Sequence, residues 1–225
     1  MAPDRSPTPA GVTGVALLSG GLDSAVAAAM FARQPGHRLA ACLFFDYGQR
    51  AAPQEARAAK ALASRWGVPW IDVALPWLGE LARSAGCRLV PGTGPLPQGT
   101  AAAPGDLETA AAVWVPGRNA VFVAIAAAHA EALQARFVVA GFNREEAATF
   151  ADNSAGFVKA ADALLALGTR GGVRVVSPTL PWDKDEIVAA AKALGFQAED
   201  FWSCYDGGPV PCGRCESCLR SRWRR

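Results

Sequence analysis

Residues 18–24 have the sequence LSGGLDS, and this short stretch decides how the rest of the chain is interpreted. An apolar run at 15–18 precedes it, as is typical of a buried strand, and an alanine-rich run at 23–33 follows it and predicts a helix. Two adjacent glycines allow a left-handed backbone and let a ligand approach the main chain closely. The first amides of a helix have no partners inside it and carry partial positive charge. A strand, a glycine turn and a helix therefore predict a cradle for a phosphate group.

The polar side chains of this loop fit a phosphate site with one exception. Ser19 and Ser24 add hydroxyl donors, whereas the carboxylate of Asp23 repels a phosphate unless a divalent cation such as Mg²⁺ bridges them. The alternative is that Asp23 or Ser24 only caps the helix and that the glycines make a tight turn. The loop is neither a Walker A loop, since no Lys-Ser/Thr pair follows the glycines, nor the dinucleotide motif G-x-G-x-x-G.

Apolar runs and helix-like runs alternate along the rest of the chain. We expect strands over 15–18, 40–45, 70–74, 137–140 and 173–177, and helices over 23–33, 54–66, 119–135, 156–167 and 184–194. Each expected strand is nearly continuous in apolar residues, as a sheet buried on both faces requires. The alternation predicts an α/β fold with a doubly wound, mostly parallel sheet. Ligands of such sheets bind beyond the carboxyl ends of the strands, where the glycine loop lies.

The expected organisation has three parts. Residues 1–12, with three prolines, form a disordered tail, residues 13–200 form the α/β domain, and residues 201–225 form a cysteine-bearing C-terminal segment. Pro91–Asp106 interrupts the alternation, because its prolines and glycines exclude a helix or a central strand. We expect this long loop to be functional or mobile, and the sequence leaves open whether it closes over a substrate.

Composition narrows the class of protein. Of 225 residues, 51% are hydrophobic and 19% are charged, which supports a buried core and excludes a disordered chain. A net charge of +2 argues against a protein held on nucleic acid by phosphate attraction, so we expect no direct nucleic-acid partner. Apolar runs of about eight residues are too short to span a bilayer, and the N-terminus lacks an export signal. We therefore expect a cytoplasmic protein with no membrane partner and with its cysteines in a reducing compartment.

Four cysteines gather near the C-terminus in the spacing C-x7-C-x2-C-x2-C: Cys204, Cys212, Cys215 and Cys218. Clustered cysteines in a reducing compartment indicate a metal or catalysis rather than disulfides. Four thiolates at short spacing suit tetrahedral Zn²⁺ with no open coordination position, which is a structural site. Gly213 supplies the tight turn that lets neighbouring thiolates converge. The prediction is one structural zinc ion per chain.

Other interpretations of the cysteines stay open. Three cysteines at this spacing also occur in ferredoxins, but here the fourth cysteine lies upstream and Leu219-Arg220 follows Cys218, which disfavours an iron–sulfur cluster. A zinc ribbon that binds nucleic acid would use the arginines of residues 220–225, although a basic tail is more often solvated charge. Cys42 lies in an expected strand and fits a small core residue.

The SGGxDS sequence of residues 19–24, between a strand and a helix, resembles the pyrophosphate loop of the PP-loop ATP pyrophosphatases. Those enzymes cut ATP between the α- and β-phosphates, adenylate a carboxylate or carbonyl oxygen, and let a nucleophile displace AMP. The resemblance implies an adenine nucleotide α-hydrolase-like fold and a loop that holds the leaving pyrophosphate. It assigns ATP binding to Leu18, Ser19, Gly20, Gly21, Leu22, Asp23, Ser24, Ala25 and Asp46.

From about residue 13 to 220, the chain resembles the 7-cyano-7-deazaguanine synthases of queuosine biosynthesis, a tRNA modification pathway. The matching pieces are residues 19–24, DYGQR at 46–50, VPGRN at 115–119, GFN at 141–143, SPTL at 177–180 before Lys184, and SCY at 203–205 leading to PCGRCESC at 211–218. Their order and spacing extend through the full length, which is more specific than either motif alone. The resemblance implies a carbon–nitrogen ligase that uses ATP and Mg²⁺ to convert 7-carboxy-7-deazaguanine and ammonia to 7-cyano-7-deazaguanine (preQ0).

The implied reaction has two activation steps. The carboxylate attacks the α-phosphate of ATP, pyrophosphate leaves into the loop, and ammonia displaces AMP to give an amide. A second ATP activates the amide oxygen, and loss of AMP gives the nitrile. The protein mainly positions groups and neutralises phosphate charge, with Mg²⁺ across the phosphate oxygens.

The resemblance assigns catalytic roles to Asp23, Ser24, Arg118 and Lys184. Arg118 opens an expected helix and would clamp a phosphate or the substrate carboxylate bidentately, against the alternative of a surface ion pair. Lys184 would hold a phosphate, or pair with Asp183 or Glu186 on an exposed face. Asp46, at the end of an expected strand, would meet the nucleoside part of ATP, unless it is only a turn residue.

Substrate contacts are assigned to Tyr47, Gln49, Arg118, Asn119, Asn143 and Asp152. Tyr47 and Phe150 would stack on a purine-like base, although aromatic residues near strand ends more often pack in a core. Residues 149–154, TFADNS, depart from the GYPDCR-like stretch of many family members, since Asp152 fits and Asn153 and Ser154 do not. This departure puts the identity of the ligand or the acceptor amine in question.

Three alternatives therefore remain. The first is a PP-loop amide ligase that joins a deazaguanine carboxylate to another amine. The second is a different tRNA-modifying PP-loop enzyme, and the third is a zinc-ribbon module without activity. Thiolating PP-loop enzymes usually need a cysteine pair, and Cys42 and Cys87 lie in no recognisable motif. The near-neutral charge argues against the binding module. The sequence leaves the nitrogen source and the oligomeric state open, with a homodimer as one candidate.

Overall fold

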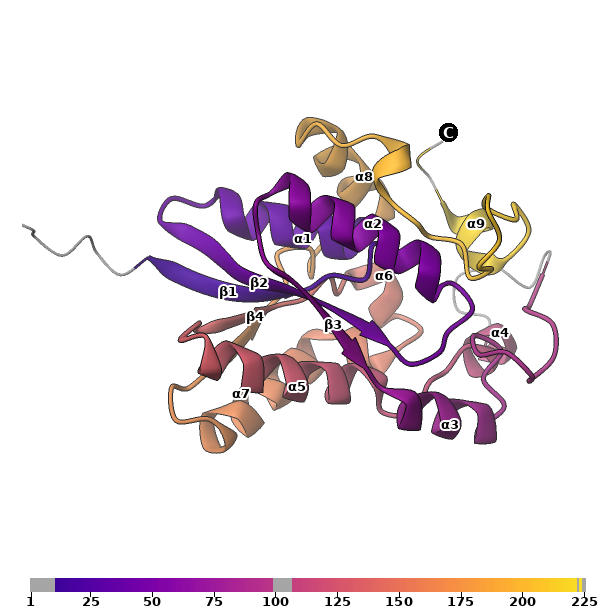
Figure 1. Cartoon of the computed structure of the whole chain (residues 1–225), viewed down its shortest axis with the longest axis horizontal. Helices are drawn as coiled ribbons and strands as arrows, with labels where there is room; N and C mark the ends of the chain where they lie inside the picture. The colour runs from indigo at the N-terminus through magenta and orange to yellow at the C-terminus, as the bar shows by residue number, and fades with distance from the viewer. Residues whose placement is uncertain (1–10, 99–106, 222, 224–225) are drawn as a thin grey trace, which may run out of the picture.

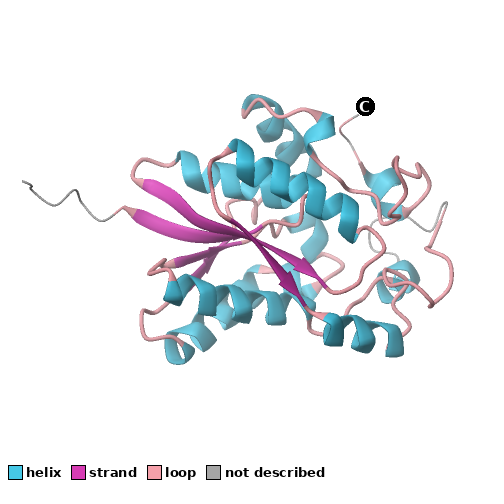
Figure 2. Ribbon diagram, in the orientation of Figure 1, coloured by secondary structure: helices cyan, strands magenta, loops and turns pink. Residues whose placement is uncertain are grey.

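A five-stranded parallel sheet lies between two layers of helices in the computed structural model, which describes residues 11–98, 107–221 and 223 (Figures 1 and 2). The strands are β1 (Val12–Leu17), β2 (His37–Asp46), β3 (Trp70–Ala74), β4 (Phe137–Val139) and β5 (Arg174–Val176). Their order is β3-β2-β1-β4-β5, and all neighbours are parallel. The predicted α/β fold with a doubly wound sheet is confirmed.

Helices cover both faces of the sheet (Figure 1). On one face lie α1 (Leu22–Arg33), α2 (Ala52–Arg65) and α8 (Lys184–Ala193), and on the other lie α3 (Pro76–Ser84), α5 (Arg118–Ala132) and α7 (Ala155–Gly168). The side chains of β2 alternate between two cores, because Phe44 packs with α1, α2 and α8, whereas Leu43 and Phe45 pack with α3, α5 and α7. Both faces of the sheet are therefore buried, as its continuous apolar strands predict.

Four short helices have no counterpart in the sequence prediction: α3, α4 (Leu107–Ala112), α6 (Arg144–Ala147) and α9 (Glu216–Arg220). The 3₁₀ turns Ala151–Asn153 and Ala198–Asp200 were not predicted either. Most of these elements are too short for a helical period to appear, and α6 depends on a cap from Asn143. The first strand also begins earlier than predicted, because Thr13 and Gly14 pair with β2 despite their polar and small side chains.

The order of the strands places a crevice at the centre of the sheet. The chain passes from β1 to β2 on one side, and β4 lies against β1 on the other side. Loops that leave β1 and β4 at their carboxyl ends therefore diverge, and a ligand site is expected between them. The glycine loop follows β1, and Gly141–Asn143 follow β4.

The C-terminal segment packs against this crevice (Figure 1). Trp202, Cys204 and Cys215 form a small third core with Ala51 at the start of α2. The amide of Trp202 donates a hydrogen bond of 2.9 Å to the carbonyl of Gly20. The cysteine-bearing segment and the glycine loop are thus in direct contact.

The long loop is only partly covered by the structure. Residues 91–98 contain no helix and make one antiparallel bridge, from Gln98 to Cys215, and residues 99–106 lie outside the described residues, as do residues 1–10 of the predicted tail. Among the described residues, no helix combines the length and the apolar character needed to cross a membrane.

Candidate active site and metal centre

Close backbone contacts require glycine at two positions, one in the glycine loop and one after β4. Gly20 has a φ of 79°, and a Cβ there would lie 2.3 Å from the carbonyl oxygen of Glu55. A Cβ on Gly141, which follows β4, would lie 2.6 Å from the amide nitrogen of Ser24. The backbones after β1 and β4 therefore approach each other more closely than any side chain allows.

The N-terminus of α1 has no side-chain cap. Its N-cap is Gly21, and the Ser24 hydroxyl instead donates to the Gly21 carbonyl at 3.0 Å and lies 3.0 Å from the hydroxyl of Ser19. The alternative that Asp23 or Ser24 merely caps the helix is therefore wrong. The first amides of α1 remain available to an anion.

Lys184 pairs with two carboxylates beside this loop. Its Nζ forms an ion pair with Asp23, 161 positions away in the sequence, and lies 3.4 Å from Oε1 of Glu146. Pairing with Asp183 or Glu186 is wrong, because those side chains bind Arg144 at 3.0 and 3.3 Å. Asp23 and Lys184 thus form one unit at the phosphate loop.

Burial sets the proton affinities of this unit. It raises the pKa of Asp23 above its ordinary value despite the adjacent ammonium group. Burial alone would lower the pKa of Lys184, but Asp23 and Glu146 outweigh it and raise that pKa. One oxygen of Asp23, Oδ1, is buried without a hydrogen-bond partner among the described residues. The site therefore holds an unsatisfied acceptor next to a fixed cation.

A pocket of about 340 Å³ opens at this point, at the carboxyl ends of the strands. Its walls come from strand ends, loops and helix ends. The lining residues that the sequence singled out are Leu18, Ser19, Gly21, Leu22, Asp23, Ser24, Tyr47, Gln49, Arg118, Asn119, Asn143, Phe150, Asp152 and Lys184. Gly20, Ala25 and Asp46 do not line it. The Oδ1 of Asp46 instead accepts a hydrogen bond of 2.8 Å from the amide of Gly48, as a turn residue does.

Arg118 lies in the first turn of α5 and lines the same pocket as Lys184. It hydrogen-bonds to the Tyr47 hydroxyl, and Asp152 and Tyr205 are charged or polar neighbours. Burial alone would lower the pKa of Arg118, but Tyr47 and Asp152 raise it, so the guanidinium stays charged. A half-buried, charged guanidinium in a pocket is suited to a carboxylate or phosphate ligand. The surface ion pair considered from sequence is not what the structure shows.

Aromatic side chains form the wall next to Arg118. Trp114 and Phe150 stack with centroids 6.1 Å apart, and Phe122 stacks on Phe45 at 4.2 Å. All four line the pocket. A flat, partly apolar ligand would find a matching surface here.

The three amide side chains assigned to the substrate all make internal hydrogen bonds. Asn119 donates to the Asp152 carbonyl at 3.2 Å. Asn143 accepts from the Glu146 amide at 2.8 Å, and its own buried Nδ2 has no partner in the described part of the chain. Gln49 binds the backbone of residues 45 and 47 and the side chain of Glu55. Of the three, Asn143 offers a free donor to a ligand.

Three charged residues of the pocket were missed from sequence: Glu55, Glu146 and Arg220. Arg220 was interpreted as part of a solvated tail, and this is wrong, since its side chain is only 9% exposed. It forms ion pairs with Glu216 at 2.8 Å and with Glu145 and Glu146 of α6 at 3.6 and 3.8 Å. Its four-residue spacing from Glu216 was the one available signal.

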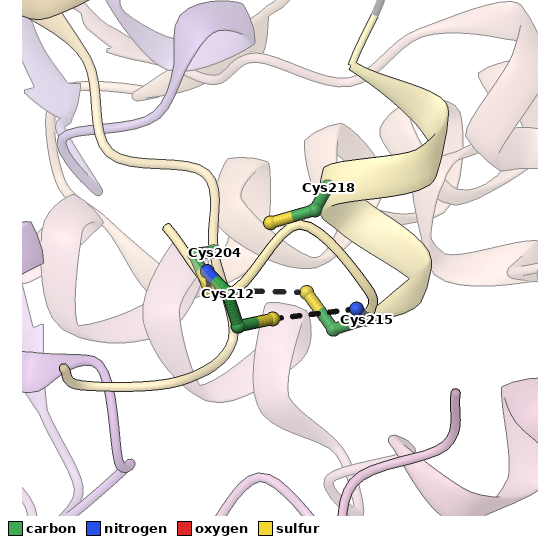
Figure 3. A group of neighbouring side chains, drawn as sticks. All are labelled: Cys204, Cys212, Cys215 and Cys218. Atoms are coloured by element: carbon green, nitrogen blue, oxygen red, sulfur yellow. Dashed lines mark hydrogen bonds between the residues drawn. The ribbon is translucent and has the colours of Figure 1, made fainter. Parts of the chain in front are cut away.

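Four cysteine sulfurs form a candidate metal centre beside the pocket (Figure 3). The Sγ atoms of Cys204, Cys212, Cys215 and Cys218 all lie within 4.8 Å of one another, and those of Cys204 and Cys215 are 3.9 Å apart. Tetrahedral Zn²⁺ with ordinary zinc–sulfur bonds requires sulfurs about 3.8 Å apart. The cluster therefore matches the size of a four-thiolate site.

The surroundings of these sulfurs also fit a cation. Backbone amides of Asp206 and Cys212 donate to Cys204 Sγ, both at 3.3 Å, as is expected for a thiolate. Burial, together with the neighbouring Cys215, raises the pKa of Cys204 to about 11. Four crowded thiolates are thus unfavourable alone, and a divalent ion reverses this balance. Cys42 and Cys87 are fully buried elsewhere in the core.

Comparison with known proteins agrees with this geometry along the whole chain. The family model described as "Queuosine biosynthesis protein QueC" matches residues 13–223. The chain belongs to the QueC family. The match includes the glycine loop, Arg118, Lys184 and all four clustered cysteines.

Relatives of this QueC chain are named 7-cyano-7-deazaguanine synthases. A 7-cyano-7-deazaguanine synthase of Pelotomaculum thermopropionicum is 47% identical over 213 residues, covering 92% of this chain and 93% of the relative. One of Methanothermobacter thermautotrophicus is 44% identical over 208 residues, with 92% and 91% covered. The structure of the U34-tRNA thiolase NcsA from Methanococcus maripaludis, with its [4Fe-4S] cluster, aligns with a TM-score of 0.51 at 16% identity, over 83% of this chain and 57% of that one. It supports the PP-loop fold alone.

Proposed function

We propose that this chain is a 7-cyano-7-deazaguanine synthase, a carbon–nitrogen ligase that makes preQ0 from 7-carboxy-7-deazaguanine, ammonia and ATP. The observation that carries the proposal is the uncapped N-terminus of α1, which opens into the same pocket as Arg118 and the aromatic wall. One cavity thus offers a phosphate site, a carboxylate site and a flat apolar surface. The family match along residues 13–223 supports this assignment over the two other PP-loop alternatives.

The phosphate end of the pocket serves the leaving pyrophosphate. The free amides of α1 and the hydroxyls of Ser19 and Ser24 bind its oxygens. Lys184, held by Asp23 and Glu146, adds a positive charge that stabilises the negative charge developing on the departing phosphates. This charge is fixed before the reaction starts, so little reorganisation is needed.

The opposite end serves the deazaguanine acid. Arg118 binds the reacting carboxylate and holds it toward the α-phosphorus, while Trp114 and Phe150 contact the flat ring system. Asp152 is partly buried beside Arg118 and accepts hydrogen bonds from ring N–H groups. These residues place the nucleophilic oxygen and the phosphorus in line.

Two metal ions accompany the proposal. The unsatisfied Oδ1 of Asp23 and the carboxylate of Glu146 would hold Mg²⁺, which would supply charge neutralisation for the phosphate oxygens of ATP. Zn²⁺ fits the four cysteines and stabilises the segment that carries Arg220. The other partners are small molecules, and no nucleic acid is needed by this chemistry.

The experiment that tests the function uses the purified chain with ATP, Mg²⁺, ammonium and 7-carboxy-7-deazaguanine. Mass spectrometry should find the nitrile, with two AMP and two pyrophosphate released for each molecule formed. A product that stops at the amide, or that forms only with another amine, would reject the proposal. Omission of the deazaguanine acid is the control and should leave ATP intact.

A further inference from the structure

Glu55 is a carboxylate in the pocket to which the reaction described so far gives no task. It lies in the first turn of α2 and lines the pocket. Its backbone carbonyl packs against Gly20 of the glycine loop so closely that a Cβ on Gly20 would lie 2.3 Å from it. The side chain lines the same pocket and has Arg118, the residue proposed to bind the reacting carboxylate, among its charged neighbours.

Gln49 fixes one oxygen of this carboxylate. Its Nε2 donates to Glu55 Oε2 at 2.9 Å, and Gln49 is itself held by the Tyr47 amide at 3.0 Å and the Phe45 carbonyl at 3.1 Å. Across residues 11–98, 107–221 and 223, no hydrogen bond reaches the second oxygen, Oε1. Oε2 thus holds the carboxylate in place, and Oε1 is free to accept a proton.

The groups around Glu55 leave it near the balance between its two protonation states. Burial raises the pKa of Glu55 to about 7, while the Gln49 hydrogen bond and Arg118 lower it and Asp46 raises it. The charged or titratable groups that face it are Arg118 on α5, Asp46 at the end of β2, and Tyr47 after it. A carboxylate in this range is suited to general base catalysis at neutral pH.

The proposed reaction needs such a base. Ammonia exists almost entirely as ammonium at neutral pH, and ammonium has no lone pair with which to attack an adenylate. The other acids of the phosphate end are committed, since Asp23 and Glu146 both pair with Lys184. Glu55 faces no lysine in the described part of the chain and keeps an open oxygen.

We propose that Glu55 is the general base that converts bound ammonium to the ammonia that attacks the adenylate. The proposal rests on the proposed function. Oε1 takes one proton from ammonium, and the nitrogen lone pair then attacks the acyl carbon. The bond from that carbon to the AMP oxygen breaks, AMP leaves with the electron pair, and the nitrogen releases a second proton to water to give the neutral amide. Glu55 returns the proton to water after the products depart.

Hydroxylamine tests this assignment, because it is largely unprotonated at neutral pH and needs no base before it attacks. Glu55→Gln should form the amide or nitrile from ammonium about a hundredfold more slowly at pH 7 than the unmodified chain. Two rates of this variant should stay within about twofold of those of the unmodified chain. These are the release of pyrophosphate that depends on 7-carboxy-7-deazaguanine and the formation of the hydroxamate from hydroxylamine. Glu80→Gln, an exposed carboxylate on α3, is the matched control and should change neither rate.

The pH profile gives an independent measurement. The rate from ammonium should fall in the unmodified chain as the pH drops below about 7, the pKa of Glu55. In Glu55→Gln the rate should instead follow the concentration of free ammonia and keep rising with pH throughout the range. Glu55→Asp, which keeps the charge but shortens the side chain, replaces the glutamine variant if that one fails to fold, with the same selective loss toward ammonium.

Three outcomes would overturn the proposal. Equal loss of hydroxamate formation and of the ammonium reaction would make Glu55 a structural or nucleotide-binding residue. A higher KM for ATP at unchanged kcat would place it on the nucleotide, and an unchanged ammonium rate would remove it from the reaction. Absence of nitrile from the unmodified chain would instead reject the proposed function, so the two failures can be told apart.

Discussion

At the scale of single residues, the site is governed by pairs of charges that meet only in the folded chain. Lys184 is the clearest case, because it neutralises Asp23 in a loop where a lone carboxylate would repel phosphate. Their side chains are 16% and 23% exposed, so solvent screens the pair only in part. The chain itself therefore supplies a cation, Lys184, at the carboxylate for which the sequence predicted Mg²⁺.

Removing the ammonium group should show how much this pair contributes. Lys184→Met leaves Asp23 and Glu146 without their shared cation, and we expect the free energy of unfolding to fall by about 2 kcal/mol. Pyrophosphate release should slow by about a hundredfold or more. Urea denaturation and a coupled pyrophosphate assay measure the two effects. Lys159→Met, on the exposed face of α7, is the control, and an equal effect there would contradict the prediction.

Glu55 predicts a pH dependence of stability. Its folded pKa of about 7 lies above the ordinary value of 4.5, so the folded state binds this proton more tightly than the unfolded state. Stability should therefore fall as the pH rises from about 4.5 to about 7, by about 3 kcal/mol for this group. Urea denaturation at several pH values should show this loss in the unmodified chain. If the pKa of Glu55 is ordinary, that chain and Glu55→Gln should show the same dependence of stability on pH, which would contradict the prediction.

At the scale of elements, the loops after β1 and β4 fix each other by contact of their backbones. The glycine at 141 lets the end of β4 touch the first turn of α1, so the phosphate loop cannot relax without moving the neighbouring strand. The helix α9 also links two parts of the site, since it carries the candidate metal ligand Cys218 and, two residues later, the pocket residue Arg220. Elements that belong to the scaffold thereby set the geometry of the site.

Gly141→Ala tests the contact between the two loops. The added Cβ would lie 2.6 Å from the Ser24 amide and 2.7 Å from backbone atoms of Asp23 and Ser24, none of which can rotate away. We expect a loss of about 2 kcal/mol in stability and a raised KM for ATP. Gly168→Ala at the end of α7, where nothing lies within 4 Å, should leave both unchanged. Equal melting temperatures of the two variants would argue against a rigid contact between the loops after β1 and β4.

The metal centre should act on both the fold and the pocket. Cys212→Ser removes one of four ligands, and we expect loss of the bound metal and a lower melting temperature, because structural zinc contributes folding energy. Release of α9 should also free Arg220 from Glu145 and Glu146 and slow turnover. Elemental analysis and thermal unfolding check this. Iron with sulfide in the unmodified protein would exclude the zinc assignment.

At the scale of the whole molecule, the pocket exists because the C-terminal segment completes a crevice that the sheet only begins. β1 and β4 open the crevice, α5 and α6 supply two walls, and Trp202, Tyr205 and Arg220 close a third. The hydrogen bond from Trp202 to Gly20 ties that wall to the phosphate loop. A change in the metal centre is therefore expected to reach the phosphate site through the backbone.

The sequence alone determined the periodic and local features. Apolar runs predicted all five strands and the long helices, since burial on both faces of a sheet leaves few polar residues in a strand. The glycine pair at 20–21 predicted a glycine turn that leads into a helix, and the spacing of residues 204–218 predicted a cluster of four cysteines, because both depend on residues close together in the chain. The resemblance to the QueC family, carried by motifs of this kind, is confirmed by the family match.

Only the tertiary structure decided which distant side chains share the pocket. It joined Lys184 to Asp23, enclosed Arg220 among acids of α6, and left Asp46 in a turn outside the cavity. Glu55 had no signal at all, because a glutamate in a first helical turn is ordinary in sequence. The physical reason is that charge pairing and burial depend on which strands become neighbours, and the order β3-β2-β1-β4-β5 is set by packing that no local period encodes.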